Sequence, residues 1–469
     1  MARRTLVLVA VLVAGCSDEP PVAPGPPAPP APGITTARVA PNLSNVLSAV
    51  VTARVVNTDS VSVRFHPLAV PPGSEDFAPA VAVSGDSAVI PVLGLLPDTA
   101  YVLRAVAFGG AASVASDSLV FRTGSLPVDL PRYTAAGSDP LPGYVVFAAG
   151  PYGLVIDNGG RVVWYRRFAP GGPGLNFMAQ PTGRYVARPT TPDTTDLDLW
   201  VEVDPLGSVV RTFGCAGGLP ARFHDLISET DGGYWILCDE TRLMDLTAVG
   251  GLANVRVTGT VVQHIGPAGE LLLHWSPFDH FAITDLELAS RVGNGVNWTH
   301  GNSLALDSDG NLIVSFRSLG EITKIDVRSG AVIWRMGGLR NQFAFSGTTV
   351  PPFARQHGVR LAAPGVLVLL DNLGDPAASR AERYAFSEAD RSAQLEQSYG
   401  PSPAVVTPIG GSVQPLPGGR FLVTFGTMGR VQEVDATGRV TWEIGGNPGY
   451  VFRAQRIRSL YNPGLDLTR

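Results

Sequence analysis

A strand–turn–strand unit that ends in an aromatic residue recurs six times along most of this chain of 469 residues. Each copy joins two apolar stretches through a tight turn, as in VIDNGGRVVWYRR from Val155 and QEVDATGRVTWEI from Gln432. Aspartate and glycine suit the turn, whereas valine, isoleucine and aromatic residues suit half-buried antiparallel strands. The closing aromatics are Trp164, Phe213, Trp275, Trp334, Tyr399 and Trp442.

The spacing of these aromatics indicates the architecture. They lie about 43 to 65 residues apart, which leaves room in each interval for the four short strands of one propeller blade. The chain contains 54 glycines and 40 prolines and shows no long stretch with helical periodicity. We therefore expect an all-β protein in which residues 140–469 form a six-bladed β-propeller.

The N-terminus has the pattern of a bacterial lipoprotein signal. Two arginines precede an apolar stretch too short to span a membrane, and the following segment VAGC, which ends at Cys16, resembles a lipobox. We expect a signal peptide at residues 1–16, lipid on Cys16, and a stiff proline-rich linker at residues 17–33. The protein would then be exported and membrane-anchored, at the outer membrane as Ser17 indicates, facing the periplasm or the exterior. An ordinary secretory signal with a chance cysteine is the alternative.

Residues 34–125 are predicted to form a separate small β-sandwich. Alternating apolar and polar residues around Val63 and Val89 are typical of half-buried strands. The segment LLPDTAY, which ends at Tyr101, resembles the tyrosine corner of fibronectin type III domains. Nothing in this segment suggests chemistry, and His66 within it is interpreted as structural.

Charge and lysine content exclude some functions. The formal net charge is −5 and no basic run is present, so nucleic acid is not expected as a partner. Lys324 is the only lysine, which leaves no room for most lysine-based chemistry.

Cys215 and Cys238 are a candidate disulfide. Both would lie in an oxidising compartment after export, and they flank the segment that contains His224. A bridge would close that loop and add about 3 kcal/mol to stability. Two unpaired cysteines in neighbouring strands are the alternative, and the absence of a CxxC spacing argues against a redox or metal role.

Three histidines occupy the same phase of three consecutive repeats. His224, His300 and His357 are each followed, eight to ten residues on, by a turn glycine and an apolar strand. Equivalent positions of a ring of repeats point toward one axis, so we expect the three imidazoles to converge. Any one of them alone would more often be structural than catalytic.

The neighbours of the histidines suggest the type of ligand. The strand after each turn glycine returns to the same rim, which places Asp239, Arg317 and Asn372 close to the histidines, and Asn302 lies two residues after His300. A cluster of imidazole, guanidinium and amide groups contains many hydrogen-bond donors and few carboxylates. Such a cluster favours a tetrahedral oxyanion.

The chain resembles the bacterial aryl-sulfate sulfotransferases that work without an adenylyl-sulfate donor. The similarity is strongest in FHD at His224, THGNSLALDSDGNLIVSFR up to Arg317, RQHGVRL at His357, FGT at Thr427, and FRAQRIRSLY near the C-terminus. The resemblance implies a six-bladed propeller that is preceded in the chain by a small β domain. It also implies sulfuryl transfer from aryl sulfates to phenols by a ping-pong mechanism, without a cofactor.

The resemblance also implies roles for individual residues. His357 matches the histidine that carries the sulfuryl group covalently. The residues that match the grip on the sulfuryl oxygens are His224, His300, Asn302, Arg317 and Thr427, with Thr424 as the second choice for the threonine. The residue types suit this chemistry, because a neutral imidazole is a good nucleophile and fixed donors stabilise charge on a group in transfer.

Two other functions remain open. Three histidines can hold zinc with one open position, as in a metal-dependent hydrolase of the propeller lactonase type, although Arg317 beside them would repel a cation. A non-catalytic ligand-binding propeller is the second alternative. If the chain is a sulfotransferase, no metal is expected.

Overall fold

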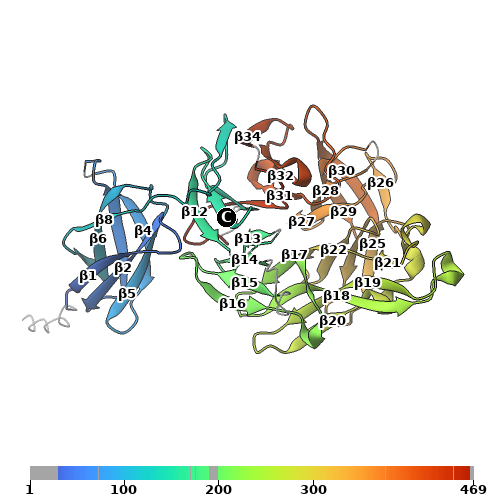
Figure 1. Ribbon diagram of the computed structural model, residues 1–469, viewed down its shortest axis with the longest axis horizontal. Coiled ribbons are helices and arrows are strands. Elements are labelled where there is room, and N and C mark those ends of the chain that lie inside the picture. Colours follow the sequence, from blue (N-terminus) through green and yellow to red (C-terminus); the bar gives the residue numbers. More distant parts are fainter. Residues whose placement is uncertain are drawn as a thin grey trace, which may run out of the picture.

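The computed structural model is built almost entirely from antiparallel β-strands (Figure 1). Among the residues that it describes, the only α-helix is α1 (Pro277–His280), and no helix is long and apolar enough to cross a membrane. The expected signal peptide, Cys16 and most of the linker lie outside the described part of the chain. The structure describes residues 30–71, 73–168, 171–174, 176–189, 199–374, 377–446 and 448–464.

The first eight strands form two sheets that face each other across an apolar core. One sheet contains β1 (Gly33–Pro41), β2 (Ser48–Val56) and β5 (Ser87–Leu93). The other contains β3 (Ser60–Pro67), β4 (Asp76–Ala82), β6 (Ala100–Gly109), β7 (Ala112–Ala115) and β8 (Leu119–Arg122). The hydroxyl of Tyr101 accepts a hydrogen bond of 2.8 Å from the backbone N–H of Leu96, so this buried tyrosine ties the corner before β6.

Six more sheets follow, which we number 1 to 6 in chain order. Sheet 1 contains β10 (Tyr144–Ala149), β11 (Tyr152–Ile156), β12 (Val162–Arg167) and β35 (Ala454–Ile457). Sheet 2 contains β13 (Phe177–Ala179), β14 (Tyr185–Ala187), β15 (Trp200–Val203) and β16 (Val209–Phe213). Sheet 3 contains β17 (Ala221–Ser228), β18 (Tyr234–Met244), β19 (Val255–Ile265), β20 (Leu271–Trp275) and β21 (Gly295–Asn297).

The remaining three sheets complete the series. Sheet 4 contains β22 (Gly301–Leu306), β23 (Leu312–Phe316), β24 (Glu321–Ile325) and β25 (Val332–Gly337). Sheet 5 contains β26 (Ala344–Ser346), β27 (His357–Ala363), β28 (Val366–Asp371), β29 (Arg380–Ser387) and β30 (Ser392–Tyr399). Sheet 6 contains β31 (Ser412–Leu416), β32 (Arg420–Phe425), β33 (Arg430–Val434), β34 (Val440–Gly445) and β9 (Thr134–Gly137).

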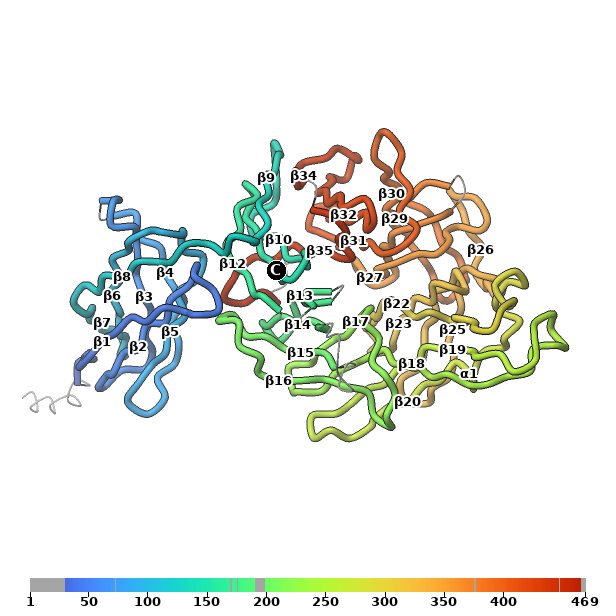
Figure 2. The backbone as a smooth tube through the Cα atoms, in the orientation of Figure 1, coloured from blue at the N-terminus to red at the C-terminus, as the bar shows by residue number. Residues whose placement is uncertain are grey.

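The six sheets are linked into a closed ring by strands from both ends of this region (Figure 2). Strand β35 pairs with β10, and β9 pairs with β34, so sheets 1 and 6 each combine early and late parts of the chain. The first strands of neighbouring sheets lie in contact around the ring: β17 with β22, β22 with β27, β27 with β31, and β35 with both β31 and β13. Strand β9 precedes residue 140, where the sequence led us to expect the ring to begin.

The closing aromatics pack between neighbouring sheets. All six are buried, and three tryptophans also donate an indole hydrogen bond to the outer turn of the next sheet. Trp164 donates to the carbonyl of Pro205 at 2.7 Å, Trp275 to Gly330 at 3.0 Å, and Trp442 to Asn158 at 2.9 Å. The repeated aromatic therefore fills the space between two sheets with its ring and fixes their separation with its N–H.

The sandwich packs against sheets 1 and 2 of the ring. The Tyr165 hydroxyl accepts a hydrogen bond of 3.1 Å from Val46 N, and the Tyr461 hydroxyl accepts one of 3.0 Å from Leu93 N. The side chain of Asn42 donates to the carbonyl of Leu206 at 2.7 Å. These contacts hold the sandwich on the outer side of the ring, away from its centre (Figure 1).

Candidate functional site

Bulges at the starts of three inner strands position the histidines. The pairing of β17 with β18 is interrupted between Ala221 and Leu226, which leaves His224 outside the regular ladder. The same kind of shift follows Gly301 in β22 and His357 in β27. A bulge releases side chains from the alternation of a strand, so these residues can point along the ring axis instead of into the sheet packing.

The structure brings His224 and His300 into direct contact. Their Nε2 atoms lie 3.2 Å apart and their rings meet edge to face. The ring of Phe452 makes edge contacts with both His224 and His357, at centroid distances of 5.7 and 6.1 Å. The three histidines therefore lie close enough together for His357 to act electrostatically on both of the others.

Arg222 determines which nitrogen of His224 carries the proton. Its Nε donates to His224 Nδ1 at 3.3 Å, and a guanidinium can only donate. The proton of neutral His224 is therefore on Nε2, where it faces the lone pair of His300 Nε2. Asn297 Nδ2 lies 2.6 Å from His300 Nδ1, and a rotation of this terminal amide would bring its oxygen to that position, where it accepts the Nδ1 proton and leaves the His300 Nε2 lone pair to His224.

His357 is held in the opposite sense, with its Nε2 free of a proton. Its Nδ1 lies 2.8 Å from Asn372 Oδ1 and 3.0 Å from the carbonyl of Arg355, both of which only accept. The Asn372 amide nitrogen donates to the carbonyls of Thr407 and Gly410, which fixes the orientation of the amide. Nδ1 therefore carries the proton, and the Nε2 lone pair accepts a hydrogen bond of 3.3 Å from Gly410 N–H.

All three histidines are neutral near pH 7. Burial lowers the pKa of His357 to about 4, with a further contribution from Arg317, although Asn372 opposes the shift. Burial, followed by the charges of Arg222 and Arg317, lowers the pKa of His300 to about 2. Burial and the Arg222 charge also hold the pKa of His224 well below its usual value.

Two arginines leave positive charge uncompensated beside these histidines. Arg317 donates to the carbonyl of Pro408 at 3.1 Å, and its backbone N–H donates to the carbonyl of His300. Burial and the charge of Arg355 lower the pKa of Arg317. Within the described part of the chain, neither Arg317 nor Arg355 forms an ion pair with a carboxylate. An anion in this position would relieve their mutual repulsion.

Asn302 and Thr427 form hydrogen bonds to neighbours of the histidine cluster and, among the described residues, none to the three imidazoles. Asn302 is buried, and its amide nitrogen donates to the carbonyl of Gln356 at 2.7 Å, the residue before His357. Thr427 is exposed, and its hydroxyl lies 2.9 Å from that of Thr407, whose carbonyl accepts from Asn372. The Thr424 hydroxyl accepts from the backbone of Ala454 instead.

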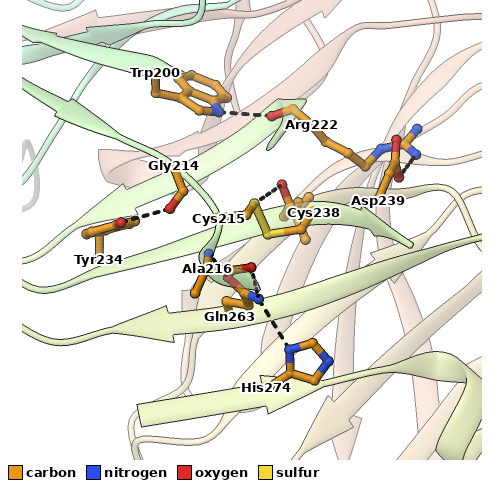
Figure 3. The surroundings of a disulfide bond; sticks show 11 residues. Trp200, Gly214, Cys215, Ala216, Arg222, Tyr234, Cys238, Asp239, Gln263 and His274 are labelled. Carbon is orange, nitrogen blue, oxygen red and sulfur yellow. Dashed lines mark hydrogen bonds and ion pairs between the residues drawn. A yellow bond between two sulfur atoms is a disulfide. The ribbon is translucent and has the colours of Figure 1, made fainter. Parts of the chain in front are cut away.

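Cys215 and Cys238 are joined by a disulfide (Figure 3). Asp239 follows Cys238 directly and forms an ion pair with Arg222, the residue that sets the tautomer of His224. The indole of Trp200 donates to the carbonyl of Arg222 at 2.9 Å and fixes its backbone (Figure 3). The disulfide thus stabilises the strand pair that orients the first histidine.

Sequence reasoning missed several residues of this cluster. Arg222, Asn297, Arg355 and Gly410 all make contacts that set the protons or the charge of the site. Arg222 and Arg355 each lie two residues before a histidine of the repeat, and this shared spacing is the signal that was available. Asn297 ends the short strand β21 and Gly410 lies in a loop, and neither segment has a repeat pattern.

A buried ion cluster lies on the far side of the histidines. Asp225 forms ion pairs with Arg453 at 2.7 Å and with Arg360 at 3.0 Å. Arg453 also donates to the carbonyl of His224 at 3.4 Å. Beyond these residues a cavity of about 560 Å³ opens between β27, β31 and β35. The cluster therefore separates the histidines from this cavity.

The side chains and charges around the histidines bear on whether the site could hold a metal ion. Among the described residues, no group of three or more histidine, cysteine or acidic side chains is arranged to hold a metal ion. The charges of Arg222, Arg317 and Arg355 act on His300 and disfavour a second cation there. The donors instead suit an oxyanion.

Comparison with known proteins identifies the relationship. Residues 221–447, which include all three histidines, match the family model described as Arylsulfotransferase (ASST). The predicted resemblance is therefore confirmed over this segment. The match covers a little under half of the chain. No curated protein matches the chain.

Solved structures with a similar fold share little sequence with this chain. A protein of unknown function from Bacteroides caccae is 11% identical, with a TM-score of 0.43 over 68% of this chain and 100% of that chain. Virginiamycin B lyase from Staphylococcus aureus is 8% identical, with a TM-score of 0.36 over 66% of this chain and 88% of that chain. Regucalcin from Agrobacterium tumefaciens is 14% identical, with a TM-score of 0.31 over 69% and 97%.

Proposed function

We propose that this protein moves a sulfuryl group from an aryl sulfate to a phenol through a covalent intermediate on His357. The observation that carries the proposal is the state of His357: Asn372 and the Arg355 carbonyl hold its proton on Nδ1, so Nε2 carries a lone pair, which accepts a long hydrogen bond of 3.3 Å from Gly410 N–H. A buried, neutral imidazole with one fixed lone pair is an oriented nucleophile. The six sheets would act as a six-bladed β-propeller that carries this group near its axis, behind a fibronectin-III-like sandwich.

The first half-reaction forms the N–S bond. Nε2 of His357 attacks sulfur, the bond between sulfur and the aryl oxygen breaks, and its electron pair leaves with the phenolate. The phenolate takes its proton from water, because the histidines beside it are neutral. The Gly410 N–H, which donates to Nε2 in the free site, becomes available to a sulfuryl oxygen once the N–S bond has formed.

The second half-reaction returns the sulfuryl group to oxygen. The hydroxyl oxygen of the acceptor phenol attacks sulfur, the N–S bond breaks, and its electrons return to Nε2. The acceptor phenol takes the place of the His224 Nε2–H at the lone pair of His300 Nε2, which accepts the phenol proton and later releases it to water. Arg317 stabilises the charge on the sulfuryl oxygens in both steps, in the way that a cationic clamp acts on a phosphoryl group.

Asn302 and Thr427 have supporting roles in this proposal. Asn302 holds the segment before His357 through the Gln356 carbonyl, and Thr427 supports Thr407, which positions Asn372. Removing either side chain should loosen His357 and not remove a direct contact with sulfur. No cofactor takes part in the proposed cycle.

Export and membrane attachment through Cys16 remain part of the proposal. The disulfide between Cys215 and Cys238 supports an oxidising compartment, since such bridges are rare in the cytosol. Metabolic labelling with a clickable fatty acid tests the anchor, with Cys16→Ser as the matched control. Label on that variant would contradict lipidation at this cysteine.

A ping-pong assay tests the proposed reaction. Wild type with 4-nitrophenyl sulfate should release a burst of nitrophenol without acceptor, and a plain phenol should then sustain turnover. His357→Ala should lose both, by about 10³-fold or more. Acid-labile sulfate on wild type, recovered on the peptide that contains His357, would identify the intermediate.

The same assay separates the alternatives. Continuous nitrophenol release without phenol would indicate a sulfatase. A stoichiometric zinc content with loss of activity on chelation would indicate the metal-dependent, lactonase-like hydrolase. Absence of turnover with retained ligand binding would indicate a non-catalytic propeller.

A further inference from the structure

A second cavity lies beside the histidine cluster, between the loops that carry Arg317 and His357. It has a volume of about 320 Å³, at the lower end of the range for small-molecule sites. One wall is formed by residues 318–320, which follow Arg317, and another by residues 350–355, which precede His357. The cavity therefore shares both of its neighbouring loops with the proposed reaction centre.

Backbone contacts fix these two loops to the histidines. The N–H of Ser318 donates to the carbonyl of Thr299, next to His300. The carbonyl of Arg355 accepts from His357 Nδ1. A ligand that fills the cavity thus lies against chain segments that are hydrogen-bonded to Thr299 and to His357.

The walls of the cavity are apolar and suit a flat ring. Leu319, Pro351 and Phe353 line it, and Leu339 and Val350 lie exposed at its mouth. Phe353 is buried and packs edge to face on Tyr384. Aromatic rings favour such surroundings, since offset and edge contacts with rings and aliphatic groups bury their faces.

Arg355 is the cationic group of this cavity. Its side chain is half-buried, and within the described part of the chain the guanidinium makes a long contact of 3.5 Å to the carbonyl of Ser318. It forms no ion pair with a carboxylate among the described residues, and its charge acts on both Arg317 and His300. Its backbone has a φ of 58°, an unusual conformation for a side chain other than glycine, which tends to persist at functional positions.

The charges of the site exceed what one sulfuryl group brings. Arg317 and Arg355 contribute two positive charges, whereas an aryl sulfate contributes one negative charge. Arg222 is already neutralised by Asp239. The other titratable residue of the cavity lining is Glu287, which is exposed. A second negative charge on the aryl group would balance Arg355.

We propose that this cavity is the aryl subsite and that it selects phenols, and their sulfates, that carry a carboxylate on the ring. The ring would lie against Leu319, Pro351 and Phe353, and the carboxylate would bind the Arg355 guanidinium. This inference rests on the proposed sulfuryl transfer at His357.

Acceptor selectivity tests the subsite. The kcat/KM values are measured for 2-, 3- and 4-hydroxybenzoate and for their methyl esters, with 4-nitrophenyl sulfate as donor. In wild type at least one isomer should be favoured over its ester by about tenfold or more. Arg355→Gln should reduce that ratio to near one, and Arg355→Lys should retain most of it.

Glu287→Gln is the matched control, because it removes the other charge of the lining. It should keep the preference for the carboxylate or increase it. An unchanged ratio in Arg355→Gln, or a wild type without preference for any isomer, would overturn the subsite while leaving sulfuryl transfer intact.

Direct binding separates failure of the subsite from failure of the proposed function. Calorimetric titration of hydroxybenzoate into wild type and Arg355→Gln, without any sulfate donor, needs no turnover. Binding of the preferred isomer to wild type that weakens about tenfold in the variant supports the cavity even if no transfer occurs. Equal binding by both, with unchanged thermal unfolding, contradicts it.

Discussion

At the scale of single residues, the histidines differ in the atoms that fix their protons. His224 is oriented by a guanidinium and His357 by an amide and a carbonyl, so one exposes an N–H where the other exposes a lone pair. The same side chain can therefore act as a donor or as a nucleophile within one cluster. The neighbours, and not the histidines themselves, assign these roles.

The acidic limb of the pH profile should report on His357. Its pKa is lowered to about 4, so protonation of Nε2 should abolish the nitrophenol burst only as the pH falls through that value. In Asn372→Asp a carboxylate would face Nδ1–H and stabilise the imidazolium, which should move the limb upward by about one pH unit or more. Burst rates measured from about pH 3 to about pH 8 would reveal this shift.

Asn372→Ala is the control for that experiment. It removes the acceptor without adding charge, so the burst should slow while the limb does not move upward. An Asn372→Asp profile that coincides with wild type would show that another group controls the acidic limb.

Arg222 should matter more to the second half-reaction than to the first. Arg222→Met frees His224 to change tautomer, so that His300 Nε2 becomes the donor of their shared hydrogen bond and loses the lone pair that the acceptor phenol needs. We expect steady-state turnover to fall about tenfold or more, with a smaller effect on the burst. Arg222→Met combined with Asp239→Asn removes the stranded carboxylate and should give the same pattern. Equal losses in both phases would argue for a purely structural role.

At the scale of elements, the disulfide ties the loop before β17 to β18. Replacing both cysteines by serine removes a cross-link over a sequence separation of 23 residues, which should lower the free energy of unfolding by about 3 kcal/mol. Chemical denaturation of the oxidised wild type and the double variant measures the loss. A variant as stable as wild type would mean that the bridge contributes only local order.

The elements also show what could be predicted from the sequence. The strand pairs and the buried aromatics follow from a pattern that repeats, and so does the phase of His224, His300 and His357. The proximity of Asn372 to His357 followed from counting along the returning strand. These features depend on local periodicity, which a single sequence displays.

Other parts of the site depend on contacts that no periodicity encodes. The bulges after Ala221 and His357 change side-chain direction without a glycine pattern that marks them reliably. Strands β9 and β35 have four residues each, too few for a recognisable alternation, and their partners lie far along the chain. Arg355 lies in an irregular loop, and its importance emerges only from the charges around it.

At the scale of the whole molecule, the ring depends on the seam between its first and last sheets. Arg456 in β35 forms a buried ion pair of 2.8 Å with Glu433 in β33 and donates to the Leu141 carbonyl and Asn158 Oδ1. The same short strand follows Arg453, which contacts His224 and Asp225 at the axis. Closure of the ring and support of the first histidine are therefore physically linked.

Arg456→Ala tests this link. Removing one partner of a buried pair leaves Arg420, at 3.0 Å, as the cation paired with Glu433 among the described residues, so the free energy of unfolding should fall by about 3 kcal/mol or more. Arg430→Ala is the matched control, since its pair with Glu443 is partly exposed and should cost about 0.5 kcal/mol. Thermal unfolding and the nitrophenol burst, followed together on heating, should fail at the same lowered temperature in Arg456→Ala. A burst that survives beyond the opening of the seam would show that the histidine cluster holds together without the closed ring.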